Sequence, residues 1–155
     1  MVHRRIRIRE YGWVVDIFYA VTCYWTGRIM RELEAIDCPE YILEMSYRNL
    51  KSCKMDTGLT YSNYLTRETV MVIGLTSSSS EFLNSFDHER KHLEAHIAEA
   101  CGIDPWGEEI AYLSGDIAQM LAKDVEMFVC HCNCCKDRLK REIENEKDTK
   151  GYTVR

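Results

Sequence analysis

The sequence predicts an α+β domain in which a small, mostly antiparallel sheet packs against helices. Short segments in which apolar residues alternate or run without interruption are typical of strands. Longer segments with apolar residues every three or four positions indicate amphipathic helices. The order along the chain is two strands, two helices, two strands and then further helices, which favours α+β over a regular alternation of strand and helix.

The composition is that of one globular domain. The chain has 155 residues, of which 46% are hydrophobic and 29% charged, enough to bury an ordinary core. We expect residues 1–135 to form a single domain. Residues 136–155 are expected to form a charged C-terminal helix and a frayed tail.

Four strands are expected. Their ranges are 4–10, 13–22, 59–65 and 68–75. The second is nearly all apolar apart from Asp16, which is typical of a strand buried in the middle of a sheet.

Five helices are expected, and residues that favour helix ends support their limits. Their ranges are 27–36, 39–53, 81–100, 104–128 and 136–147. Thr26 can cap the first helix, and Pro39 suits the first position of the second. Ser80 suits the start of the third, which Gly102 ends.

Charge and hydropathy exclude several classes of function. The formal net charge of −5 argues against a nucleic-acid binder driven by bulk electrostatics. The arginines near the N-terminus alternate with Ile6 and Ile8, which indicates a strand with a solvated face. No apolar run approaches the ~18 residues that span a membrane, and no export signal is recognisable. We therefore expect a cytoplasmic protein.

The segment His88-Glu89-Arg90-Lys91-His92 has the spacing of a zinc site. Two histidines four residues apart on a helix project from one face and can bind one ion. Zn²⁺ in catalytic sites takes three protein ligands and a water, whose pKa it lowers toward about 7. Glu89, next to the first histidine, is placed to accept a proton from that water as general base.

Glu108 is the expected third ligand. The helix that carries His92 continues about 13–15 Å beyond it, at ~1.5 Å per residue, and residues 102–107 are just long enough to return over that distance. Glu109 is the alternative. His96 lies ~12 Å along the helix from His88, too far to share its ion. It is expected either to support a ligand of the site through a hydrogen bond or to pack.

These motifs resemble those of the gluzincin metallopeptidases, in particular small single-domain members. The resemblance covers residues 68–120 and includes Ala111, a small residue three positions after Glu108. It implies a zincin-like domain in which His88, His92 and Glu108 bind Zn²⁺ and Glu89 is the catalytic base. It also implies that strand 68–75 binds the substrate as an added strand.

Tyr112, one turn past Glu108, is the candidate to stabilise a transition-state oxyanion, although core packing is the simpler role for an aromatic residue there. The expected function is a zinc-dependent hydrolase of peptide or related amide bonds. Its partners would be a peptide or protein substrate, without nucleic acid or membrane. The alternative is a catalytically silent metal-binding or protein-interaction module, which the charged residues Arg90 and Lys91 favour.

The chain has eight cysteines. Four are scattered in apolar contexts and are expected to be small core residues: Cys23, Cys38, Cys53 and Cys101. Four are bunched: Cys130, Cys132, Cys134 and Cys135. Adjacent residues cannot all point at one ion, so a second structural metal, disulfides and redox-labile thiols stay open for this cluster.

Overall fold

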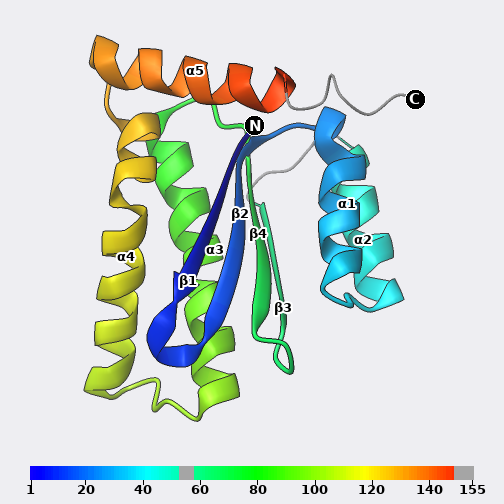
Figure 1. Cartoon of the computed structure of the whole chain (residues 1–155), viewed down its shortest axis with the longest axis vertical. Helices are drawn as coiled ribbons and strands as arrows, with labels where there is room; N and C mark the ends of the chain where they lie inside the picture. Colours follow the sequence, from blue (N-terminus) through cyan, green and yellow to red (C-terminus); the bar gives the residue numbers. More distant parts are fainter. Residues whose placement is uncertain (53–57, 149–155) are drawn as a thin grey trace.

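Four strands and five α-helices make up the described part of the chain, residues 1–52 and 58–148, in the computed structural model (Figure 1). The strands are β1 (Val2–Ile8), β2 (Trp13–Val21), β3 (Gly58–Asn63) and β4 (Glu68–Gly74). The helices are α1 (Thr26–Ala35), α2 (Glu40–Lys51), α3 (Ser79–Cys101), α4 (Glu108–Val129) and α5 (Asn133–Asp148). The predicted α+β class is confirmed.

The strands form one mixed sheet in the order β1-β2-β4-β3. β1 pairs with β2 and β3 with β4 in antiparallel orientation, whereas β2 and β4 are parallel, with Ile17 opposite Met71. β2 is central, as predicted. β4 is also flanked on both sides, so its backbone hydrogen bonds are used within the sheet. The prediction that strand 68–75 binds a substrate as an added strand is therefore wrong.

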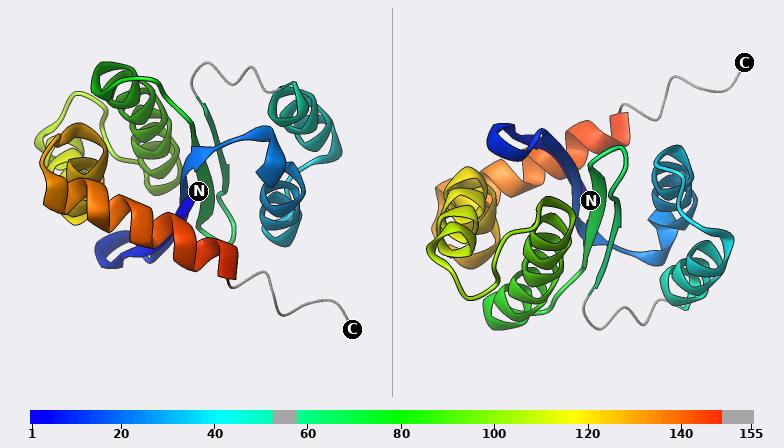
Figure 2. Two further views of the ribbon diagram at one scale, coloured as in Figure 1. Left: turned by 90° about the horizontal axis from the view of Figure 1, so that it is seen from above. Right: turned by 90° about the horizontal axis from the view of Figure 1, so that it is seen from below.

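Alternating side chains of β2 and β4 build a separate core on each face of the sheet. Ile17 and Met71 point to the face covered by α3 and α4. Phe18 and Val72 point to the opposite face, covered by α1 and α2. Figure 2 shows these two helical layers with the sheet between them. Burial on both faces explains why these two segments are so apolar.

The start and end of α3 follow from its sequence. The Ser78 side chain accepts a hydrogen bond from the Glu81 backbone N–H, which makes Ser78 the N-cap and moves the helix start two residues before the predicted range. Gly102, with a φ of 70°, ends the helix as predicted. The candidate histidines therefore lie in the middle of a helix of 23 residues.

Helix α5 runs across one end of the sheet and over the end of α4 (Figure 1). Arg4 of β1 joins it to the rest of the chain, because its guanidinium contacts Asp124 of α4 at 2.8 Å and Glu142 of α5 at 3.1 Å. Leu139 and Ile143 add apolar contacts to the core under α3 and α4. The predicted frayed tail falls mostly on residues 149–155, outside the described residues.

Within residues 1–52 and 58–148, no helix combines the length and apolar character that a membrane crossing requires.

We predict that Leu93→Ala lowers the free energy of unfolding by about 2–5 kcal/mol, the usual cost of truncating a buried leucine. Leu93 lies on α3 and is fully buried in the core beneath it. Leu65→Ala is the matched control, since Leu65 is 96% exposed and its truncation should change stability by less than about 0.5 kcal/mol. Urea denaturation measures both; equal effects would contradict this placement of α3.

Candidate metal centres

His88 and His92 point toward the same position on the exposed face of α3. Their Nε2 atoms are 3.1 Å apart, and one imidazole donates to the other in this arrangement. An ion at about 2.05 Å from both nitrogens would subtend an angle of roughly 100°, near the tetrahedral value that zinc prefers. The sequence-based prediction that one ion can contact both rings thus agrees with the geometry of the pair.

Glu89 has a buried carboxyl group. The residue is 2% exposed, and its Oε2 accepts a hydrogen bond of 2.7 Å from the Thr60 hydroxyl of β3. Burial raises the pKa of the Glu89 carboxyl. The Thr60 hydrogen bond and the nearby His88 and His92 lower the pKa and so offset part of this increase. The Glu89 carboxyl group is therefore held between α3 and β3. A general base must instead reach a water bound to the ion.

Helix α4 lies on the other side of α3 from the two imidazoles. Arg90 is two residues from each histidine and so points about 200° around the helix from both. Its guanidinium donates to the Ser114 hydroxyl of α4 at 2.8 Å and also contacts the buried Glu94. The charged residue between the histidines thus belongs to the α3–α4 contact, and that contact faces away from the candidate ion.

The carboxylates proposed as third ligand do not join the histidine pair. Glu108 is exposed in the first turn of α4, and Glu109 accepts a hydrogen bond from the Tyr11 hydroxyl at 3.2 Å. Among the residues that the structure describes, neither forms a group of three ligand atoms with His88 and His92.

Tyr112 and His96 are the two further side chains that the sequence singled out. Tyr112 is 70% exposed on α4, so it does not pack in the core. His96 hydrogen-bonds through Nδ1 to the Ser62 hydroxyl at 2.9 Å and contacts the Tyr64 ring. These contacts agree with the packing role, one of the two roles expected for His96.

Three cysteines at the corner between α4 and α5 form the cluster of metal-ligating atoms found in the described chain. The sulfur atoms of Cys130, Cys132 and Cys135 lie within 4.8 Å of one another. Cys132 Sγ is 3.1 Å from Cys130 Sγ and 2.8 Å from Cys134 Sγ. All four cysteines of the cluster are free thiols, and none of them forms a disulfide.

The start of α5 brings these sulfurs together. The helix begins at Asn133, three residues before the predicted range. The Cys132 carbonyl accepts the first helical hydrogen bond, from Lys136, and its sulfur accepts the Cys135 N–H at 3.5 Å. Cys132 is thus the N-cap, in the position that serine or aspartate usually occupies, and Cys135 follows one turn later on the same side.

The two ends of this helical turn differ in exposure and acidity. Cys132 is exposed, and hydrogen bonds from Cys134, Cys130 and the Cys135 backbone lower its pKa to about 6. Cys135 is 7% exposed, and its hydrogen bond with the Cys132 sulfur, together with burial, raises the pKa of its thiol. A helix N-terminus favours a thiolate at Cys132, the form that binds metal ions.

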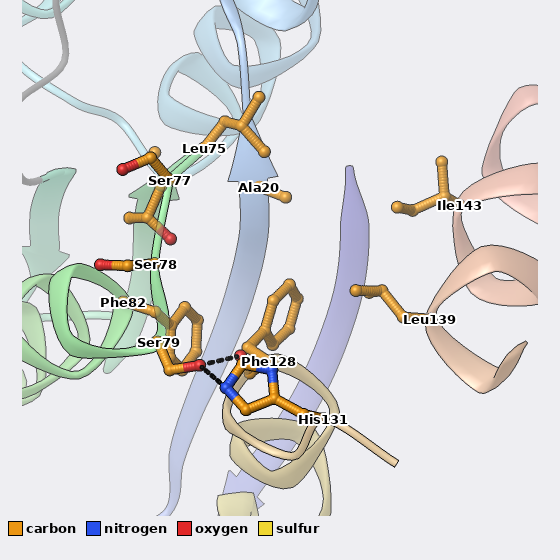
Figure 3. A pocket seen from close by; sticks show the side chains of 12 residues that line it. Ala20, Leu75, Ser77, Ser78, Ser79, Phe82, Phe128, His131, Leu139 and Ile143 are labelled. Atoms are coloured by element: carbon orange, nitrogen blue, oxygen red, sulfur yellow. Dashed lines mark hydrogen bonds between the residues drawn. The ribbon is translucent and has the colours of Figure 1, made fainter. Parts of the chain in front are cut away.

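A small pocket lies next to the thiol cluster, at the ends of β2 and β4 (Figure 3). Its walls include Phe82 and Phe128, and Leu139 lines it from α5. His131, which lies between Cys130 and Cys132 in the sequence, reaches the pocket, and its Nε2 is 3.4 Å from the Ser79 hydroxyl. The cysteine side chains do not line this pocket, so it is separate from the cluster.

The scattered cysteines only partly match the prediction. Cys38 is buried in the core beneath α1 and α2, as expected, and burial raises its pKa to about 11. Cys101 is a half-buried free thiol packed against the other core. Cys23 is disulfide-bonded, so its prediction as a simple core residue is wrong. Cys53 lies outside the described residues.

No protein-family model matches the chain, and neither the curated proteins nor the solved structures contain a match.

Two features of these centres were not predicted from the sequence. Thr60, the partner of Glu89, belongs to a strand far away in the chain, and no local pattern indicates that contact. The cysteine cluster carried a usable signal: Cys132 and Cys135 have the Cys-x-x-Cys spacing that one helical turn brings together. Placing the helix start at residue 136 hid that relation.

We predict that Glu89→Gln makes the protein more stable at neutral and alkaline pH. Because the pKa of Glu89 is raised on folding, its contribution to stability is fully present at low pH and is lost as the carboxyl ionises. Urea denaturation at a series of pH values measures the free energy of unfolding. This free energy should decrease less toward high pH in the variant than in the unsubstituted protein. Below about pH 3, where glutamate is protonated in both states, the two proteins should differ little. Greater stability of the unsubstituted protein at pH 8 would contradict the prediction.

Proposed function

We propose that this protein binds a zinc ion through the thiolates of Cys130, Cys132 and Cys135. The convergence of these three sulfur atoms carries the proposal. Thiolates are the preferred soft ligands of Zn²⁺, at Zn–S distances of about 2.3 Å, which place the sulfurs of a tetrahedral site about 3.8 Å apart. The 3.1 Å separation of Cys130 and Cys132 and the 4.8 Å limit for the group bracket this value.

The proposed site has one coordination position left for a water or an outside ligand. Three protein ligands plus an exchangeable fourth are typical of reactive zinc sites, while four protein ligands are typical of structural ones. Cys134 is the nearest additional thiol, 2.8 Å from Cys132, and its pKa is raised by the hydrogen bond to Cys132. We assign it to support the Cys132 thiolate.

An ion at this site would fix the corner between two helices. Cys130 is the C-cap of α4, whereas Cys132 and Cys135 belong to the start of α5. Coordination by all three would therefore join the two helix ends, and α5 in turn contacts β1 through Arg4. Since the ligands are brought together only by folding, zinc binding would stabilise the folded state.

The histidine pair supports a second candidate, the zinc-dependent hydrolase. The observation that favours it is the 3.1 Å separation of the Nε2 atoms of His88 and His92. A catalytic centre there needs a third ligand other than Glu108 or Glu109. It also needs Glu89 to leave its buried hydrogen bond with Thr60. The cysteine site requires neither step, and for this reason we rank it first.

We predict about one zinc per chain in the reduced protein, lost in Cys132→Ser. Serine is also a good N-cap, so the variant removes the sulfur ligand while keeping the start of α5. Cys101→Ser, a thiol far from the corner along the chain, should retain the metal. Elemental analysis after gel filtration measures the stoichiometry, and circular dichroism checks the helix content. Full zinc in Cys132→Ser would contradict the cysteine site.

We further predict that the double variant His88→Ala, His92→Ala keeps its zinc. Loss of the metal from this variant, with retention in Cys132→Ser, would instead assign the ion to the histidines and favour the hydrolase candidate. Absence of zinc from all variants, despite intact folding and added Zn²⁺, would exclude both. As a second readout, zinc at about 100 times its Kd should stabilise the binding form by ~2.7 kcal/mol.

A further inference from the structure

The pocket outside the ends of β2 and β4 has a volume of about 240 Å³ (Figure 3). These two strands are parallel neighbours in the sheet. The chain leaves β2 for α1 on one face of the sheet and leaves β4 for α3 on the opposite face. In open sheets, ligands bind in the crevice outside the carboxyl ends of parallel strands where such connections diverge. The pocket therefore lies where this topology favours a ligand.

The backbone of β2 is irregular where it meets the pocket. The pairing of β2 with β4 shifts between Phe18 and Val21, and Ala20 has a φ of 53°. A positive φ is uncommon for a residue with a side chain and persists where the surrounding structure imposes it. Bulges in strands are frequent beside functional sites. Ala20 lines the pocket, so this irregularity lies in the pocket wall.

Apolar side chains from three helices form most of the wall. Phe82 of α3 and Phe128 of α4 both line the pocket, and their rings are stacked with centroids 4.5 Å apart. Leu139 and Ile143 point from α5 toward the strand ends (Figure 3). A flat aromatic ring packs well beside two phenylalanines, through stacked or edge contacts. Since an apolar cavity of about 150 Å³ binds benzene, this pocket has room for one substituted ring.

The polar part of the wall includes a serine hydroxyl whose hydrogen bonds are long. Ser79 Oγ donates to the carbonyl oxygens of Phe128 and Val129 at 3.3 and 3.4 Å. It also lies 3.4 Å from Nε2 of His131. Hydroxyl groups usually bond to oxygen at about 2.5–3.0 Å, so each of these contacts is weak. A ligand hydroxyl beside Ser79 can accept from the serine or the imidazole and donate to a carbonyl at the end of α4.

The wall favours an uncharged ligand. Apart from His131, no titratable side chain is among the described residues that line the pocket. The first turn of α3 and the last turn of α4 meet beside it and carry partial charges of opposite sign, so together they favour neither an anion nor a cation. Glu81 is already bound to the Ser77 N–H and hydroxyl, at 2.8 Å each. A charged group in the pocket would thus lack a matching partner in the wall.

We propose that this pocket binds a small uncharged aromatic molecule with one hydroxyl group, a ligand of the phenol class. Its ring packs against Phe82 and Phe128, and its hydroxyl pairs with Ser79 and a carbonyl at the end of α4. Small-molecule sites commonly combine apolar walls with a few polar groups that fix orientation. The site does not depend on the proposed zinc centre, because none of the three cysteine ligands lines the pocket.

Four probes of similar size test the ligand class in titrations of the full chain followed by protein NMR. p-Cresol should bind with a Kd of about 1 mM or less, a reasonable affinity for a ligand of its size. Toluene lacks the hydroxyl and should bind about fivefold more weakly, the usual effect of one hydrogen bond. p-Toluate is charged and should bind at least about tenfold more weakly. 4-Methylcyclohexanol is not flat and should bind about threefold more weakly.

Two pairs of variants test the location of the site. Ser79→Ala should remove the preference for p-cresol over toluene, and it keeps the Ser78 cap of α3. Ser80→Ala, at a residue that does not line the pocket, should retain that preference. Ile143→Trp should weaken p-cresol binding at least about tenfold, because the larger side chain fills the pocket. Ile110→Trp is its matched control, since Ile110 is also half-buried against the same core but lies near the start of α4.

Circular dichroism checks that each variant is folded. Absence of p-cresol binding by the folded full chain would overturn the proposal. Equal binding of toluene, p-toluate or 4-methylcyclohexanol would overturn the assigned ligand class. An equal effect of both members of either pair of variants would show that the phenol binds elsewhere.

Discussion

Burial of β2 and β4 on both faces is the constraint on which the rest of the structure depends. Their side chains supply two cores, one beneath α3 and α4 and one beneath α1 and α2. A strand covered on both faces must be apolar at nearly every position. The exception in β2, Asp16, is compensated by contacts with His3 at 2.7 Å and Arg5 at 2.9 Å. Each helical layer therefore has a fixed face against the sheet, and its remaining faces are available for other contacts.

The C-terminal corner depends on this sheet through one arginine. Arg4 lies in β1 and contacts carboxylates on both α4 and α5. A partly buried arginine between two acids is held in place, since removal of either partner leaves charge without compensation. The thiol cluster lies between the two helices that Arg4 joins. Its geometry thus rests on a contact with the opposite end of the chain, and Cys130, Cys132 and Cys135 are arranged by tertiary structure as well as by local spacing.

Most of the fold could be predicted from sequence because the hydrophobic patterns are strong. All four strands and all five helices of the described chain were expected, with ends that differ by a few residues. The convergence of His88 and His92 follows from helical geometry alone. The third ligand could not be predicted in the same way, because chain length limits how far Glu108 can reach but not on which side of α3 the next helix packs. Arg90, whose charge favoured a silent module, indicates that side only once its contact with Ser114 is known.

The cysteine cluster had a local sequence signal, but the position of the helix start concealed it. Its spacing was visible, but a shift of three residues in the start of α5 decides whether the sulfurs diverge along an irregular segment or meet across one turn. A thiol at the N-cap has a weaker sequence signal than serine or aspartate, so the helix start was placed too late. Small errors in helix limits therefore matter most where functional groups lie at those limits.

The strand order also has a consequence for how copies of this protein avoid one another. The sheet ends in β1 and β3, and an edge strand offers unpaired backbone groups to any neighbouring chain. Along β1, Arg5 and Arg7 are exposed, so two such edges brought together would repel one another. On the other side, β3 has only six residues, a short template for further pairing. The arginine-rich start of the chain can thus be understood as protection against aggregation through its outermost strand.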